Sequence, residues 1–436
     1  MRRLITAAAV ADASGILASP GGVLVEGHCV LGVGPISEFE GLDGFEREDL
    51  GSSLLMPGLV NLHAHLDLSH IGPVPFNGDF VSWVDLVRAQ RVEDEASLAA
   101  SIDLGVAYAL AGGTVAVGDI AGLGRAVVAQ QLLGSGLLGV SYIEVFGHGS
   151  HAQAAVDMLS TRINSSATSS AVPVSNVSGS GSREPYAAGM KLGAQPHAPY
   201  SCGLSVYEAA AQLRVPMATH LSETRAELDF VARAQGPFAE LLHRLGKWDQ
   251  SIEPQNCHPV ESLSSVLSWA PCVVAHVNYL DKHACDLLAR WPVTVAYCPR
   301  ASAYFGHPDG QPENHPYRQL LERGVRVGLG TDSLLCLDTP NRISILDEMR
   351  FLWRRDGIEP VRLLQMATVN GAMGLHLDPS LVLLNKGPVA GLIAIPGVEH
   401  SGQEALRDVL ASDEQPVWAL PPKNADIDGS LRLVSQ

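Results

Sequence analysis

Short apolar runs alternate with longer amphipathic segments through most of this chain. Eight of the runs have the pattern of buried strands, at 59–65, 114–120, 137–145, 190–197, 217–221, 272–277, 293–298 and 325–330. Segments with helical periodicity lie between them, at 95–111, 206–213, 226–246, 283–291, 317–324 and 343–355. Parallel strands joined by helices produce this alternation, and eight of them predict a (β/α)8 (TIM) barrel. A doubly wound open sheet is the alternative, but the Gly-x-Gly-x-x-Gly turn expected after its first strand is absent.

The two ends of the chain have a different pattern. Residues 1–55 alternate short β-like runs with Gly and Pro turns, and another β-like run follows at 386–396. We therefore predict a small β-sandwich domain built from 1–55 and 371–436, beside a barrel at 56–370. Within the barrel, 164–183 consists almost wholly of small and polar residues, which predicts a mobile surface loop.

Composition narrows the kind of partner. The chain has 29 Lys and Arg against 46 Asp and Glu, a formal net charge of -17, which disfavours nucleic acids and anionic membrane surfaces. No apolar stretch reaches the roughly 18 residues of a membrane span. Its 7 cysteines are scattered without a Cys-x-x-Cys pair, as in reduced cytosolic proteins. We expect a cytoplasmic protein with a small-molecule ligand. The composition does not decide whether the protein forms a homo-oligomer.

Histidines and acids gather where the predicted strands end. The carboxyl ends of barrel strands share one mouth, so side chains there meet in space. They are His63 and His65 after the first strand, His197 after the fourth, His220 and Glu223 after the fifth, His276 after the sixth and Asp332 after the eighth. Each alone has a structural explanation, such as a buried imidazole satisfied by hydrogen bonds or an acid that caps a helix or turn. Three imidazoles and one carboxylate together suit Zn²⁺, with Fe²⁺ as the alternative.

Five motifs in this order resemble the amidohydrolase superfamily. They are Pro57-Gly-Leu-Val-Asn-Leu-His-Ala-His, His197-Ala-Pro-Tyr-Ser, His220-Leu-Ser-Glu, Ala275-His-Val-Asn-Tyr-Leu and Gly330-Thr-Asp-Ser. The similarity is to the branch with cytosine, S-adenosylhomocysteine and aminodeoxyfutalosine deaminases. It implies one divalent ion held by His63, His65, His220 and Asp332. It also implies catalytic roles in proton transfer and water orientation for Glu223, His276 and Asp332, and substrate contact for His197.

The expected activity is hydrolytic deamination, in which metal-bound hydroxide attacks an amino-substituted heterocycle and ammonia leaves. The resemblance favours a substrate like an aminopurine nucleoside, aminodeoxyfutalosine included. Trp83 could stack on a flat ring, and Arg88 or Arg300 could bind a carboxylate or sugar oxygen. The alternatives are a cyclic amide hydrolase or triazine-type chlorohydrolase of the same superfamily, and, in another class, a non-catalytic barrel that serves as a binding or assembly module.

Overall fold

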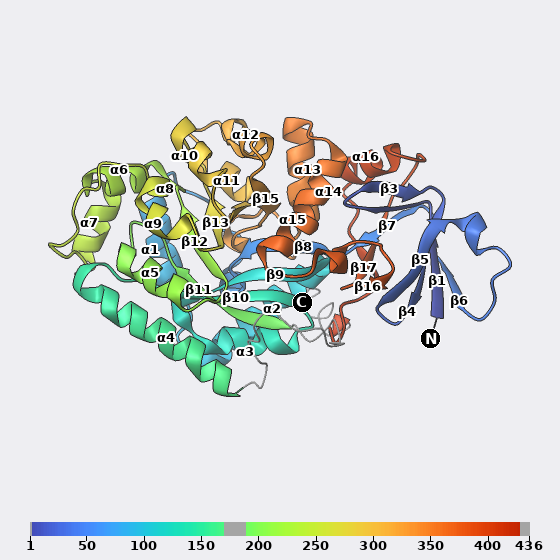
Figure 1. Ribbon diagram of the computed structural model, residues 1–436, viewed down its shortest axis with the longest axis horizontal. Coiled ribbons are helices and arrows are strands. Elements are labelled where there is room, and N and C mark those ends of the chain that lie inside the picture. The colour runs from blue at the N-terminus through green and yellow to red at the C-terminus, as the bar shows by residue number, and fades with distance from the viewer. Residues whose placement is uncertain (1, 170–188, 428–436) are drawn as a thin grey trace.

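The computed structural model describes residues 2–169 and 189–427, which contain a barrel and two further sheets (Figure 1). The eight-stranded sheet runs in chain order, with every neighbouring pair parallel. Its strands are β8 (Leu59–Ala64), β9 (Thr114–Ala121), β10 (Leu138–Val145), β11 (Met190–Pro196), β12 (Met217–Leu221), β13 (Cys272–His276), β14 (Val293–Tyr297) and β15 (Arg326–Leu329). The predicted (β/α)8 barrel is confirmed, with strand ends within one or two residues of the expected ones.

The barrel closes between its first and last strands beside the polar strand ends. The backbone N–H groups of Thr331 and Asp332 both donate to the carbonyl of His63, at 3.0 Å. The Asn61 side chain reinforces this closure, because its Nδ2 donates to Thr331 Oγ1 at 2.8 Å. Two motifs that lie far apart in the sequence are thereby joined by hydrogen bonds at the mouth.

Strand periodicity divides the core into two layers. In β13, Val273 and Ala275 belong to the cluster inside the barrel, whereas Cys272 and Val274 belong to the larger cluster under the helices. Successive side chains of a strand point to opposite faces, so each apolar strand supplies both layers. This explains why apolar residues occupy most positions on both faces of the barrel strands.

Helices cover the outside of the barrel, and short ones shape its mouth. They are α1 (Phe80–Gln90), α2 (Glu95–Ala111), α3 (Ala126–Gly134), α4 (Ala152–Ser169), α5 (Leu204–Gln212), α6 (Arg225–Arg233), α7 (Pro237–Arg244), α8 (Pro259–Ser262), α9 (Ser264–Leu267), α10 (Lys282–Leu288), α11 (Pro299–Phe305), α12 (Tyr317–Glu322), α13 (Ile345–Asp356), α14 (Pro360–Ala367), α15 (Val369–Gly374) and α16 (Glu404–Ala411). Among the described residues, no helix combines the length and the apolar character needed to cross a membrane.

Two expectations about helices differ from the structure. The single helix predicted at 226–246 is the pair α6 and α7, because Ala234 and Gly236 take left-handed backbone conformations and Pro237 begins the next helix. The loop predicted at 164–183 is helical over its first residues, since α4 continues to Ser169. The remainder of that predicted loop, from 170 onward, lies outside the described residues.

Strands from both chain ends form the two further sheets, which lie beside the barrel (Figure 1). One contains β1 (Arg2–Ala7), β4 (Gly21–Glu26), β5 (Cys29–Pro35), β6 (Glu46–Asp49) and β16 (Gly387–Pro388); the other contains β2 (Ala9–Asp12), β3 (Gly15–Ala18), β7 (Ser53–Pro57), β17 (Leu392–Pro396) and β18 (Val417–Leu420). Strand β17 pairs with β7, which leads directly into the first barrel strand. The predicted association of the two chain ends is therefore present, while the domain boundaries at 55/56 and 370/371 stay predictions.

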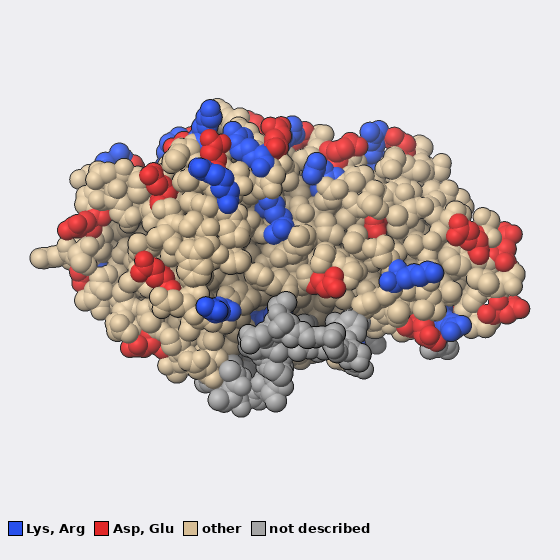
Figure 2. All heavy atoms as spheres, in the orientation of Figure 1, with Lys and Arg blue, Asp and Glu red and all other residues tan. Residues whose placement is uncertain are grey.

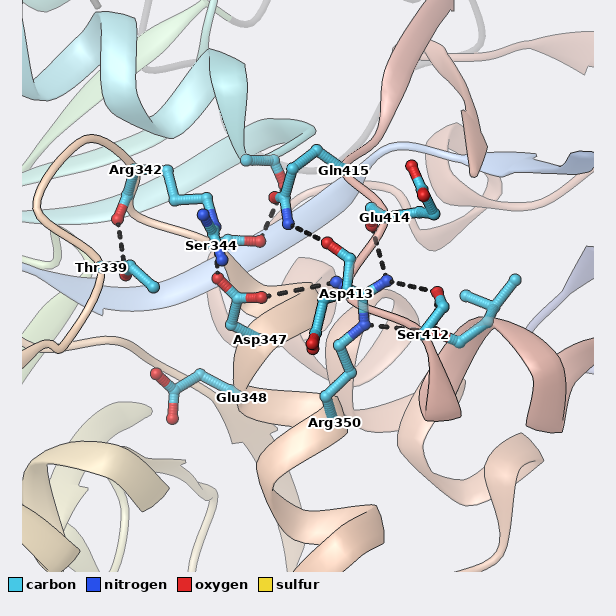
Figure 3. Close-up of polar contacts among 12 residues, drawn as sticks. Thr339, Arg342, Ser344, Asp347, Glu348, Arg350, Ser412, Asp413, Glu414 and Gln415 are labelled. Atoms are coloured by element: carbon cyan, nitrogen blue, oxygen red, sulfur yellow. Dashed lines mark hydrogen bonds and ion pairs between the residues drawn. The ribbon is translucent and has the colours of Figure 1, made fainter. Parts of the chain in front are cut away.

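A buried arginine ties the C-terminal segment to the barrel helix α13 (Figure 3). Arg350 is 2% exposed; its Nε donates to the Val409 carbonyl at 3.1 Å and its Nη2 to the Glu414 carbonyl at 2.6 Å. Asp347, one turn earlier, lies 3.5 Å from Nη1. A buried charge needs such partners, so these contacts fix residues 409–414 against the barrel.

Charged side chains are spread over the surface. On the face seen in Figure 2, Lys and Arg lie among Asp and Glu, and neither sign forms a continuous patch. The excess of acids is therefore not concentrated on this face.

Candidate active site

Three imidazoles meet at the barrel mouth, and their geometry suits a metal ion. Ring nitrogens of His63, His65 and His220 lie within 4.8 Å of one another, and all three residues are buried. The Nε2 atoms of His65 and His220 are 3.4 Å apart, and His65 Nε2 is 3.6 Å from Asp332 Oδ1. Two ligands about 2.0–2.1 Å from one tetrahedral ion lie about 3.4 Å apart. His63 Nε2 has no hydrogen-bond partner among the described residues, as a ligand atom requires.

The protonation of these rings also suits a ligand role. Burial is the largest effect, and it lowers the pKa of His63 and His65 well below the usual value and that of His220 to about 3. The imidazoles are therefore neutral at pH 7, as metal binding demands. His220 Nδ1 lies 3.0 Å from the carbonyl of His197, to which it donates, so its Nε2 lone pair faces the other rings.

A second group borders the first. Oxygen or nitrogen atoms of Glu223, His276 and Asp332 lie within 4.8 Å of one another, and Glu223 Oε1 is 3.7 Å from His276 Nε2. Burial and then the nearby Asp332 raise the pKa of Glu223 well above that of a free glutamate. Burial raises the pKa of Asp332 to about 7. A carboxyl group that keeps its proton near neutral pH can act as a general acid.

The backbone aims these side chains in two ways. His220 follows Ala218 at strand spacing and so shares its inward direction. His276 and Asp332 instead have left-handed conformations, with φ of 72° and 62°. Such conformations cost about 1–3 kcal/mol in a non-glycine residue and persist where the surrounding structure fixes them. His315 helps to fix one of them, because its Nε2 donates to the His276 carbonyl at 2.8 Å.

These groups open into a cavity of ≈ 380 Å³ with mostly apolar walls. The wall formed by α1 and α7 is apolar and aromatic, with Phe80, Trp83, Val84, Val87, Phe238, Leu241 and Leu242. Ligand cavities of this volume and character take small organic molecules, whose rings pack on aromatic side chains.

Three of the four predicted substrate contacts lie at the cavity, and the fourth lies elsewhere. Trp83, Arg88 and His197 line the cavity. Arg300 is not among the cavity-lining residues, and it lies buried in an ion pair in which its Nε is 2.6 Å from Glu348 Oε1. The expected substrate contact by Arg300 is therefore replaced by a structural one: Glu348 is fully buried and needs a cation.

Sequence reasoning missed several cavity residues. Glu144 lines the cavity and lies one residue before the end of β10, so its position at a strand end is the sequence signal that indicates it. His148 also lines the cavity, and its Nε2 donates to the Pro199 carbonyl at 3.0 Å. Arg91 also lines the cavity, just beyond the end of α1, in a segment without a distinctive pattern.

Comparison with known proteins identifies the family. The model of the amidohydrolase family matches residues 54–419. This chain belongs to the amidohydrolase family. The resemblance drawn from its motifs is thus confirmed.

Individual proteins of known name are similar to this chain at low sequence identity. A 5-methylthioadenosine/S-adenosylhomocysteine deaminase of Halothermothrix orenii is 28% identical over 213 residues, 46% of this chain and 43% of the relative. The corresponding protein of Bacillus cytotoxicus is 23% identical over 84% of this chain and 75% of the relative. The match to the Halothermothrix orenii protein thus spans less than half the length of that relative.

Solved structures share the fold over nearly the whole chain. The aminofutalosine deaminase of Helicobacter pylori has a TM-score of 0.76 at 18% identity, with 97% of this chain and 99% of that chain covered. A zinc-bound adenosine deaminase of Xanthomonas campestris has a TM-score of 0.73 at 18% identity, with 100% and 97% covered. At this identity the likeness shows the fold alone.

Proposed function

We propose that this protein is a metal-dependent hydrolytic deaminase that converts an amino-substituted heterocycle and water into the oxo product and ammonia. The observation that carries the proposal is the adjacency of two buried groups, the His63–His65–His220 cluster and the Glu223–His276–Asp332 cluster, at the base of an apolar cavity. The names of the relatives favour an aminopurine nucleoside, with aminodeoxyfutalosine as one candidate.

In this proposal, His63, His65, His220 and Asp332 hold one divalent ion, with Zn²⁺ favoured over Fe²⁺ because imidazole nitrogens predominate. When bound, such an ion lowers the pKa of a coordinated water and so supplies a nucleophile at neutral pH. Unpartnered ring nitrogens buried beside a carboxylate support this assignment, because an empty pocket of this kind would leave them desolvated without compensation.

The side chains of the second group move the protons. Burial raises the pKa of Glu223 and so favours its protonated form, and Glu223 passes that proton to a ring nitrogen of the substrate as the water attacks the amino-bearing carbon. His276 Nε2 has no hydrogen-bond partner among the described residues and lies 3.7 Å from Glu223 Oε1. In this position it orients the attacking water. Asp332 accepts one proton from that water and transfers it to the amino group, which leaves as ammonia, while the remaining hydroxyl proton returns to Glu223 as the oxo product forms.

The cavity walls position the substrate. Trp83 contacts Phe305 edge-on, with ring centroids 5.0 Å apart, which holds its indole in place beside the cavity. A flat heterocycle that packs on this wall displaces water from around the reacting carbon, and charges act more strongly there when water is excluded.

An ammonia-release screen tests the proposal. The zinc-loaded protein is incubated with aminopurine and aminopyrimidine nucleosides and with aminodeoxyfutalosine, and chloride and carboxylate release from chlorotriazines and cyclic amides are measured in parallel. We expect ammonia from at least one nucleoside. Chloride or carboxylate release without ammonia would replace the deaminase by one of the two related hydrolases.

A further inference from the structure

A polar patch interrupts the apolar cavity wall next to the proposed metal site. It consists of Glu144, His197 and Arg91, all of which line the cavity. Glu144 Oε1 and His197 Nε2 are 3.9 Å apart. Glu144, His197 and His220 also offer ligand atoms within 4.8 Å of one another, so the patch lies beside the reacting centre.

One carboxylate oxygen of Glu144 accepts a hydrogen bond within the protein, and the other does not. Its Oε2 accepts the backbone N–H of Leu123 at 3.1 Å and lies 3.9 Å from Arg91 Nη2. No described residue donates a hydrogen bond to Oε1. Since Glu144 is only 2% exposed, this oxygen depends on a cavity occupant for a donor.

The hydrogen bonds around His197 make its Nε2 a second acceptor. Ser201 Oγ donates its single hydrogen to the Ala198 carbonyl at 3.1 Å. Nδ1 of His197 lies 2.7 Å from the same Oγ and, with the hydroxyl hydrogen directed at Ala198, donates to it. A neutral imidazole with its hydrogen on Nδ1 carries a lone pair on Nε2. Two acceptors thus face one position in the cavity.

Arg91 adds a donor to the same patch. Its Nη1 donates to Asp67 Oδ2 at 2.6 Å, while its Nη2 makes no hydrogen bond to any described residue. The patch therefore presents two acceptors and one donor. Hydroxyl groups match this combination because each both donates and accepts, whereas an ammonium group cannot use the donor and a carboxylate cannot use the acceptors.

We propose that Glu144 is a specificity-determining residue which, with His197, binds adjacent hydroxyl groups on the substrate, such as the vicinal diol of a sugar. The proposal rests on the deaminase function above and assigns the part of the substrate that the metal site does not touch. Loss of a hydrogen bond to a carboxylate that stays buried is costly, so an analogue without the hydroxyls binds about 10- to 100-fold more weakly.

The experiment compares nucleosides with and without the diol. Binding of inosine and 2′,3′-dideoxyinosine to the zinc-loaded full chain is measured by calorimetry, because neither has an amino group to lose. Ammonia release from adenosine and 2′,3′-dideoxyadenosine is measured in parallel. Wild type is compared with Glu144→Gln, which keeps the side-chain size, and with Glu208→Gln, which changes an exposed glutamate on α5.

We expect wild type and Glu208→Gln to favour the diol at least tenfold, and Glu144→Gln to reduce that ratio below about threefold with unchanged zinc content. An unchanged ratio in Glu144→Gln, or no binding preference in wild type, overturns the proposal. So does a loss of one of two bound zinc ions in Glu144→Gln, which would make Glu144 a ligand of a second ion. If the binding preference holds while no compound in the ammonia-release screen is deaminated, the hydroxyl site stands and the deaminase function falls.

Discussion

Replacing Glu223 by Gln should abolish turnover while leaving the fold and the metal site intact. Gln has nearly the same shape as the protonated carboxyl group, and burial holds Glu223 in that form. The backbone around it is fixed independently of the carboxyl: Glu223 N–H donates to Glu227 Oε2 at 2.9 Å, and Asn278 Nδ2 donates to the Glu223 carbonyl at 2.9 Å. We therefore expect a change in the free energy of unfolding within about 0.5 kcal/mol.

The expected loss of activity follows from the proton that Gln cannot transfer. General acid catalysis contributes about 10²- to 10⁴-fold. Loss of that contribution raises the activation barrier by about 2.7–5.4 kcal/mol, at about 1.36 kcal/mol for each factor of ten. The assay is kcat for ammonia release, with zinc per chain and urea denaturation measured on the same preparation.

Glu208→Gln is the matched control, since this exposed glutamate lies away from the cavity lining and should leave all three measurements unchanged. Retention of kcat within about threefold of wild type by a folded, zinc-loaded Glu223→Gln would refute the proton transfer assigned to this residue.

Three further outcomes follow from the same geometry. His220→Ala should lower bound zinc to well under one ion per chain in atomic emission measurements, whereas His243→Ala, at an exposed helix position, should keep it. Arg300→Ala should destabilise the fold by about 3–5 kcal/mol in urea denaturation, because Glu348 stays buried without its cation. Arg88→Ala should cost under about 1 kcal/mol, because its side chain is 49% exposed. Equal effects of the two substitutions would contradict this expectation. Burial, and after it the nearby Asp67, raises the pKa of Asp119 to about 8, so the folded state keeps a proton that the unfolded state loses near pH 4. The free energy of unfolding should therefore fall as the pH rises from about 4 to 8. Asp119→Asn should flatten this pH dependence, and an unchanged dependence would argue against a protonated Asp119.

The barrel and the meeting of histidines and acids at its mouth could be predicted because both follow from local patterns. Apolar runs of strand length recur at regular intervals, and His63, His220 and Asp332 stand where those runs end. The topology of a parallel barrel then brings strand ends together without any knowledge of the packing. Helix boundaries at 95–111 were accessible for a similar reason, since Asp94 caps the first turn of α2.

Partners that depend on side-chain packing could not be predicted in this way. Arg300 was expected to bind a carboxylate or sugar oxygen of the substrate, but its side chain turns toward Glu348 on α13, which no periodicity indicates. The acceptor role of His197 depends on the direction in which Ser201 donates. Such choices are made by hydrogen-bond competition in the folded protein and leave no spacing signal in the sequence.

The pairing of β7 with β17 has a consequence for the order in which this protein matures. The strand that leads into His63 and His65 takes its antiparallel partner from Leu392–Pro396, so β7 cannot pair on that side until synthesis has passed this later strand. Unpaired backbone groups of a buried strand are costly, and multi-element chains expose such edges until their partners emerge from the ribosome. A chain halted between Asp332 and Leu392 would carry every proposed metal ligand yet lack the strand that steadies the first of them. We therefore expect the metal to be bound stably only after β17 has been synthesised and has paired with β7.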